Sequence, residues 1–170
     1  PLQDQLDVGL RKLELDVFYQ PRSRTFPVGH VQVIDMNSHC LTLRACLIEI
    51  VQWSDANPQH SPIWISFNAK DQQIDWLPAP TLFDAQAFST MDDVLEEVVG
   101  SRLSRPAAVK APDASLPKWP TLDEARGKFL MILDEGGAKR ETYLNGWRQR
   151  PMFTSVGIEH PAAAVMIVND

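Results

Sequence analysis

Short apolar runs alternate along the chain with longer stretches of helical periodicity. Leu13, Leu15 and Val17 alternate with Glu14, Asp16 and Phe18, while 28–34 and 62–67 are short β-branched and aromatic runs, as is typical of strands. Between these two runs, residues 40–54 carry apolar side chains at helical spacing, and Asn57-Pro58 ends the pattern. This part of the chain therefore predicts three strands and a helix, and the second strand, the helix and the third strand form one βαβ unit.

The rest of the chain continues the alternation. Residues 83–99 predict a second helix, with Asp84 as its N-cap and Gly100 as its stop. Residues 102–120 hold four of the 13 prolines and predict a surface excursion. Thr121 and Glu124 have the spacing of a capping box that opens a short helix. The other expected elements are strands at 128–133, 152–156 and 163–168 and a helix at 138–147.

The order of these elements indicates an α/β protein whose mostly parallel sheet is covered by helices. A doubly wound sheet and a closed barrel share this order. Glu14 and Asp16, however, lie on one face of the first strand, and two buried carboxylates are costly unless a positive charge lies between them. Residues two apart lie about 7 Å apart along a strand, close enough to reach one cation. We therefore expect a TIM-type (β/α) barrel with a metal at its C-terminal mouth.

Composition and charge narrow the choice of function. The 170 residues are 44% hydrophobic and 22% charged, as in a globular protein rather than a disordered one. The 16 basic and 22 acidic residues give a net charge of −6, and the basic residues are scattered, which argues against nucleic-acid binding. No apolar run approaches the roughly 20 residues of a membrane-spanning helix.

Five residues are candidates for chemistry, and each has a simpler interpretation. Glu14 and Asp16 are either metal ligands or the solvated face of an edge strand. His30 ends the second expected strand as a catalytic group or a hydrogen-bonded structural residue. Asn68 offers a neutral oxygen ligand. Lys70, on the same face, is either a phosphate-seeking cation or an ordinary solvated strand end.

Cys40 and Cys46 lie six residues apart, which is not a zinc-binding spacing by itself. Two interpretations are open. They are two buried thiols of a helix, or they close a small disulfide loop at the helix entrance in a secreted protein.

Residues 30–35 read H-V-Q-V-I-D, and residues 120–128 read P-T-L-D-E-A-R-G-K. They resemble the H-V-Q-D-I-D motif and the P-T-L-x-E-A-R-G-K segment of the calcium-dependent, phosphatidylinositol-specific phospholipase C-like family of bacteria and fungi. The other similar segments are residues 1–18, which resemble its second-strand region, the cysteine pair with Leu47, residues 133–135, and the turn-like 169–170.

This resemblance implies a phosphodiesterase on a TIM-type barrel that acts on phosphatidylinositol or a related glycerophosphodiester. It implies that a divalent ion, usually calcium, is held by Glu14 and Asp16, with Asn68 at the position of a further ligand. His30 matches the second of two catalytic histidines, which transfers a proton to the leaving diacylglycerol oxygen. Lys70 would contact the substrate phosphate.

The sequence also departs from the family pattern. Asn68 stands where the family has a glutamate, and Val33 replaces an aspartate. The strand that carries the family's first catalytic histidine is not in these residues, and none of His39, His60 or His160 has the context to replace it. A second function is therefore open: a catalytically impaired barrel that binds a phospholipid or phosphosugar.

A complete barrel takes about 250 residues, so 170 residues leave roughly six strands. We expect one domain over residues 1–170, a partial barrel without its first strand and its last, from a longer chain. Trp76 and Trp119 lie in proline-rich connections and either touch a membrane peripherally or pack against the protein. Family habit and the possible disulfide predict a secreted or periplasmic protein.

Overall fold

The computed structural model describes residues 1–36 and 38–168, so the expected turn at 169–170 lies outside the described residues. Its centre is a parallel sheet in the order β1-β2-β3-β4. The strands are β1 (Lys12–Val17), β2 (Ile63–Ala69), β3 (Phe129–Leu133) and β4 (Met152–Thr154). The helices are α1 (Leu2–Asp7), α2 (Leu43–Ala56), α3 (Ala85–Val99), the 3₁₀ turn η1 (Gly100–Arg102), α4 (Pro106–Val109) and α5 (Gly137–Leu144).

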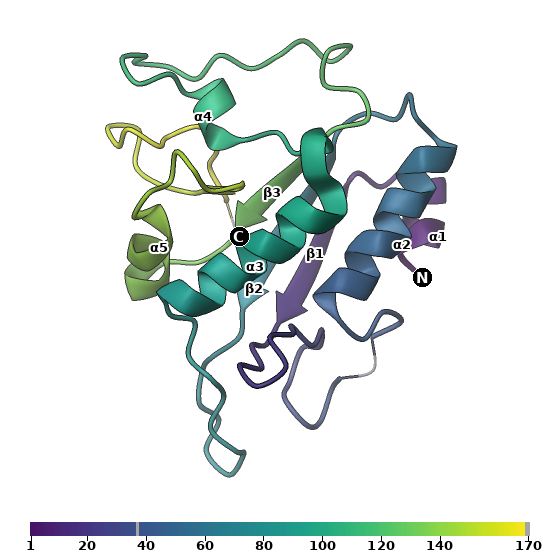
Figure 1. The fold of residues 1–170 in the computed structure, drawn as a ribbon, viewed down its shortest axis with the longest axis vertical. Helices are drawn as coiled ribbons and strands as arrows, with labels where there is room; N and C mark the ends of the chain where they lie inside the picture. Colours follow the sequence, from purple (N-terminus) through teal and green to yellow (C-terminus); the bar gives the residue numbers. More distant parts are fainter. Residues whose placement is uncertain (37, 169–170) are drawn as a thin grey trace.

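Helices α2 and α3 cover one face of the sheet, which we call the outer face (Figure 1). Alternate residues of β1 and β2 are buried against them, Leu13 to Val17 on β1 and Ile63 to Ala69 on β2. The intervening residues, among them Glu14, Asp16 and Asn68, lie on the opposite, inner face. This sequential order of parallel strands confirms the α/β, TIM-type architecture, and within the described residues the sheet is not closed into a barrel.

The helices predicted at residues 40–54, 83–99 and 138–147 form, with small shifts at their ends. Asp84 caps α3 by accepting a hydrogen bond from the Ala87 N–H at 2.8 Å, and Gly100 follows with a φ of 58°, as a helix stop requires. Helix α2 begins later than predicted, at Leu43, because Thr42 accepts from the Ala45 N–H. Both caps fix where the connections to the strands begin.

Two predicted strands are absent from the described residues, which leaves four strands instead of roughly six. Residues 28–34 form a turn with isolated bridges from Val28 to Val17 and from Val31 to Asp35. Residues 163–168 form a single bridge, between Val165 and Ser155. Both runs are apolar, but their apolar residues are used in turns rather than in a continuous ladder of hydrogen bonds.

The capping box at Thr121 forms, but it closes a turn and not the expected helix. Glu124 accepts from the Thr121 N–H at 2.8 Å, and Thr121 Oγ1 accepts from the Glu124 N–H at 3.3 Å. Residues 122–127 continue as turns to Gly127, whose φ is 68°. The motif therefore fixes the local turn without helical continuation.

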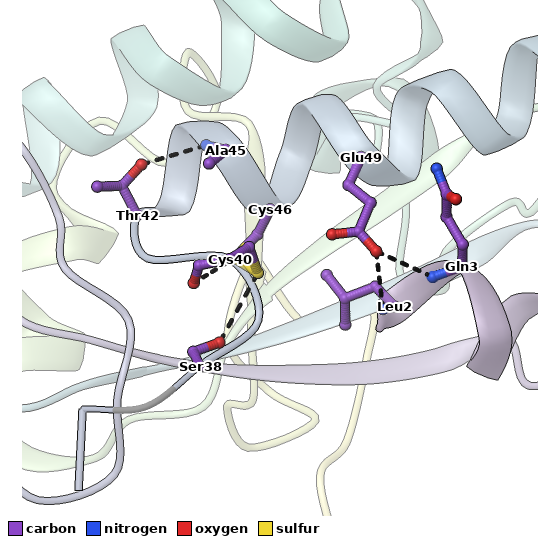
Figure 2. Close-up of a disulfide and its surroundings, with 8 residues drawn as sticks. All are labelled: Leu2, Gln3, Ser38, Cys40, Thr42, Ala45, Cys46 and Glu49. Atoms are coloured by element: carbon purple, nitrogen blue, oxygen red, sulfur yellow. Dashed lines mark hydrogen bonds between the residues drawn. A yellow bond between two sulfur atoms is a disulfide. The ribbon is translucent and has the colours of Figure 1, made fainter.

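Cys40 and Cys46 form a disulfide at the entrance of α2, which decides between the two interpretations (Figure 2). The same helix carries Glu49, whose Oε1 accepts from the Leu2 and Gln3 N–H groups and so caps α1. Helix α1 was not predicted from the sequence. The start of α2 is thus tied to the preceding connection and its middle to the N-terminal helix.

On the inner face, β3 and β4 pack against the excursion at residues 102–120. Leu130, Ile132 and Phe153 form a second apolar cluster with Val109 of α4. Trp119 stacks between Trp64 and Phe153, with ring centroids 6.2 and 5.4 Å away. This tryptophan packs against the protein, whereas Trp76 is 77% exposed.

A buried carboxylate links α3 to α5. Asp92 accepts hydrogen bonds from the Tyr143 hydroxyl at 2.7 Å and from Arg150 at 2.8 Å. Burial raises the pKa of Asp92 to about 6, against the lowering effect of these two donors. The Tyr143 hydroxyl in turn accepts from the Met152 N–H, so the network reaches β4.

We expect this network to make stability depend on pH below neutrality. The pKa of Asp92 in the folded state lies above its ordinary value. The free energy of unfolding therefore falls by roughly 3 kcal/mol as pH rises from about 4 to about 6. Urea unfolding of the full-length protein at pH 4 and pH 7 should show this loss, and Asp92→Asn should remove most of it. The neighbouring exposed Asp93, replaced by Asn, is the matched control; an equal change in both variants would contradict the prediction.

Within the part of the chain that the structure describes, every helix is too short or too polar to cross a bilayer.

Candidate functional site

The acidic pair of β1 lies on the inner face near the strand's carboxyl end. In the register with β2, Glu14 is opposite Ser66 and Asp16 is opposite Asn68. Glu14 is exposed and Asp16 is partly buried. The period-two prediction for this strand is confirmed, and it brings oxygen-bearing side chains of two neighbouring strands together.

Asp16 is the centre of a small polar cluster. Its Oδ1 accepts a hydrogen bond from the Asn68 amide at 2.8 Å, and its Oδ2 lies 3.2 Å from the Lys70 ammonium. The Asp16 side chain is 13% exposed, so these partners replace most of the water around the carboxylate. Three of the five predicted site residues are therefore in direct contact.

His30 reaches the same edge through a tight turn that follows β1. The Gly29 N–H donates to the Asp16 carbonyl at 3.1 Å, and the His30 N–H donates to the Asp35 carbonyl at 2.9 Å. The His30 imidazole Nδ1 lies 4.0 Å from the Asp35 carboxylate. Within this turn Val33 has a φ of 70°, a strained conformation for a β-branched residue.

His30 and Lys70 line one cavity of about 200 Å³ at this edge of the sheet. Most of the other lining is apolar. Its residues are Phe18, Val31, Gln32, Gln72, Ile74 and Leu77. Lys70 therefore connects the Asp16 cluster to the cavity that His30 lines, so that Asp16, Asn68, Lys70 and His30 come together from three segments of the chain.

The donor set is of the kind that calcium prefers. Glu14 and Asp16 supply carboxylates. A 180° rotation of the Asn68 amide group would exchange its nitrogen, which now donates to Asp16, for its oxygen. Hard cations such as calcium take carboxylate and amide oxygens as ligands, and affinity rises with their charge. Among the described residues no group of three or more His, Cys, Asp or Glu residues is arranged to hold a metal ion, in keeping with a neutral Asn68 in the third position.

Sequence reasoning missed further polar residues at this edge. Asp134 directly follows β3, and its N–H donates to the Phe67 carbonyl, which brings it next to Asn68 in the sheet. Asp71, Glu135 and Lys139 form ion pairs beside the end of β2. Acidic residues immediately after buried strands were the available signal, because carboxyl ends of parallel strands meet at one edge.

His60 and His160 do not join this site. His60 is buried at the other end of β2, where its Nδ1–H donates to the Ser61 carbonyl and its Nε2 accepts from the Ser54 hydroxyl. Burial lowers the pKa of His60, so the neutral ring fits this arrangement. His160 accepts from the Ala162 N–H within a turn.

Gly29 sets the position of His30, and we expect its replacement to impair the site. A Cβ at this residue would lie 2.6 Å from Met36 Sδ and 2.8 Å from the Asp35 carbonyl oxygen, so Gly29→Ala must push the turn outward. The displaced turn would carry His30 away from the cavity that it lines. Gly157→Ala, where a Cβ meets open space, is the control; the backbone amide NMR signals of residues 29–35 should shift only in the first variant.

The parallel sheet, its helix-covered outer face and the polar cluster at its carboxyl edge are those of a portion of a TIM-type barrel. The chain belongs to the calcium-dependent phosphoinositide phospholipase C family, whose model matches residues 20–170. A comparison with curated protein sequences finds no match.

Two solved structures illustrate the similarity of fold. A calcium-dependent phosphatidylinositol-specific phospholipase C from Streptomyces antibioticus is 21% identical, with a TM-score of 0.70. A calcium-dependent phosphoinositol-specific phospholipase C from a Pseudomonas species, in an apo form and a myoinositol complex, is 20% identical, also with a TM-score of 0.70. Each match covers 90% of this chain and 59% of the other, so the chain spans less than two thirds of these enzymes.

Proposed function

We propose that the protein cleaves the phosphodiester bond of phosphatidylinositol or a related glycerophosphodiester in a calcium-dependent reaction. The observation that carries this proposal is the convergence of Asp16, Asn68 and Lys70 beside the cavity that His30 lines. Family membership supports the reaction class, and the two solved enzymes named above act on this class of lipid.

Each residue has a role that follows from its chemistry. Glu14, Asp16 and Asn68 would hold calcium, and the bound ion supplies positive charge that lowers the pKa of the attacking inositol 2-hydroxyl and stabilises charge on the phosphate. Lys70 would bind a phosphate oxygen from the cavity side. His30 would donate a proton to the diacylglycerol oxygen as its bond to phosphorus breaks. The apolar walls of the cavity would keep water away from the reacting phosphate.

A binding function without catalysis is the alternative. Asn68 lowers the ligand charge, and Val33 stands in a strained turn next to His30 where the family has an aspartate. Such a barrel would bind a phospholipid or phosphosugar headgroup at the same cavity. The two functions differ in whether product forms.

We also propose peripheral contact with a membrane at the carboxyl edge of the sheet. The connections that follow β1 and β2 both extend at this end (Figure 1). They expose large apolar side chains, with Val33 68%, Trp76 77% and Leu82 69% accessible. Exposed apolar side chains beside a site are typical of interaction surfaces. The disulfide supports a secreted or periplasmic location, since such bonds persist in oxidising compartments.

The test is a turnover assay on the full-length protein. Vesicles with and without phosphatidylinositol are incubated with the protein in calcium or in a chelator, and released inositol phosphate is measured. Product that requires both calcium and the inositol lipid supports the phospholipase. Vesicle binding without product would favour the binding module, and neither binding nor product would contradict both.

A further inference from the structure

We propose that Lys139 and Glu135 form a side-chain clasp that positions Asn68 and Lys70 at the mouth of the barrel. Its relevance to catalysis rests on the proposed function. The clasp itself is a structural device that can be tested without substrate or metal.

The need for the clasp arises where β3 ends. The Ile63 N–H and the Phe67 carbonyl of β2 point toward β3. The Trp64 N–H, and the N–H of Lys70 directly after the strand, point toward β1. Ala69 therefore directs its N–H and carbonyl toward β3, but the paired residues of β2 and β3 stop at Phe67 and Leu133. Two backbone groups between Asn68 and Lys70 would lack a strand partner, which is costly away from water.

Side chains take the place of the missing strand. Glu135 Oε1 accepts from the Ala69 N–H at 2.6 Å, and the Lys139 ammonium donates to the Ala69 carbonyl at 2.6 Å. The same ammonium lies 2.7 Å from Glu135 Oε2 and 3.0 Å from Asp71 Oδ1. Both backbone groups of Ala69 are thus held by charged partners, which form stronger hydrogen bonds than neutral ones.

The clasp also fixes the connection that leaves β2. Asp71 Oδ2 accepts from the Phe83 N–H at 2.9 Å, so the two ends of the 71–83 connection are tied together. The side chains are 13% exposed for Glu135, 14% for Asp71 and 25% for Lys139. At this burial the ion pairs are screened less by solvent than surface pairs are.

The consequence falls on the two neighbours of Ala69. Alternation along a strand places Asn68 and Lys70 on the inner face, and the held backbone between them limits how far either can move. Asn68 of β2 and Lys70, which directly follows the strand, both contact Asp16. Lys139, which lies on α5, therefore acts on the site as a positioning residue.

The experiment compares Lys139→Met with Lys128→Met in the full-length protein. Lys128 also donates to one backbone carbonyl, that of Ser101, but at the opposite end of β3. Amide exchange and the side-chain amide signals of Asn68 are followed by NMR, and calcium affinity by calorimetry. In Lys139→Met the Ala69 carbonyl loses its donor, and Glu135, which accepts from the Ala69 N–H, loses its ion pair. We therefore expect the Ala69 amide to exchange about threefold faster, the Asn68 side-chain signals to shift and broaden, and calcium affinity to fall about three- to tenfold.

Lys139→Arg should restore part of each effect, because a guanidinium keeps the charge and donors. Unchanged Ala69 exchange and Asn68 signals, or equal changes in Lys128→Met, would overturn the proposal. If Lys139→Met does not fold, Glu135→Gln provides the second variant, and its weaker acceptor should speed Ala69 exchange about threefold. Absence of calcium binding in the wild type would contradict the proposed function but leave the exchange and Asn68 readouts to decide on the clasp.

Discussion

Replacing Asp16 with alanine should abolish calcium binding by the full-length protein. Asp16 lies between Asn68 and Lys70 at the centre of the polar cluster. Its loss removes one of two formal negative charges among the proposed ligands and leaves Lys70 facing the site unpaired. Replacing a residue that only hydrogen-bonds to a metal ligand costs about 10- to 100-fold in metal affinity. Loss of the ligand itself should therefore cost about 100-fold or more. Calorimetric titration with calcium measures the effect directly.

The control is Asp113→Ala, which removes an exposed carboxylate from the excursion at residues 102–120. It should bind calcium as the wild type does. Calcium binding that survives in Asp16→Ala at wild-type affinity would show that the ion binds elsewhere and would contradict the assignment of Glu14, Asp16 and Asn68.

The same charge argument gives a change of opposite sign for Asn68→Glu. A third carboxylate should tighten calcium binding about tenfold, because ligand charge sets affinity in such sites. Without calcium, the new carboxylate would face Asp16 at the distance of the present hydrogen bond, so the melting temperature should fall in chelator and recover in calcium. An affinity that does not rise would mean that the residue at 68 does not contact the ion.

Much of the sheet could be predicted because its signals are local. Leu13 to Val17 alternate with Glu14 and Asp16, so period two alone assigned the acidic pair to one face. The cap at Asp84 and the stop at Gly100 follow from side-chain and backbone preferences within one helix. The sequence also predicted that Asn68 points toward the same mouth as Asp16, but their direct contact appears only in the structure, where β1 and β2 are neighbours.

The failures concern geometry that depends on distant partners. Residues 28–34 have strand-like composition, but Gly29 packs against Met36 and Val33 takes a positive φ, so the run folds into a turn. The clasp joins residues that are 66 and 70 positions apart, and no local pattern connects Ala69 with Glu135 or Lys139. For Cys40 and Cys46, the sequence left both a disulfide and two free thiols open, because it does not show that the segment before α2 lies against that helix.

Replacing His30 with glutamine should lower the rate of phosphatidylinositol cleavage by about 100- to 10,000-fold, the usual contribution of a general acid. Calcium affinity should stay unchanged, since His30 touches the cavity and not the Asp16 cluster. The loss should appear in kcat and not in KM, because the proton is needed only as the leaving oxygen departs. His160→Gln, a change within a turn where the ring accepts from the Ala162 N–H, is the matched control.

The leaving group distinguishes proton donation from simple positioning. In an inositol phosphodiester with a nitrophenyl group, the nitrophenolate leaves without needing a proton. His30→Gln should therefore slow cleavage of this substrate far less than cleavage of the natural lipid. Equal losses with both substrates would contradict the acid role and make His30 a residue that orients the phosphate. If the wild type binds calcium and inositol lipid but cleaves neither substrate, the cavity serves recognition alone, and the strained turn at Val33 and the neutral Asn68 account for the lost chemistry.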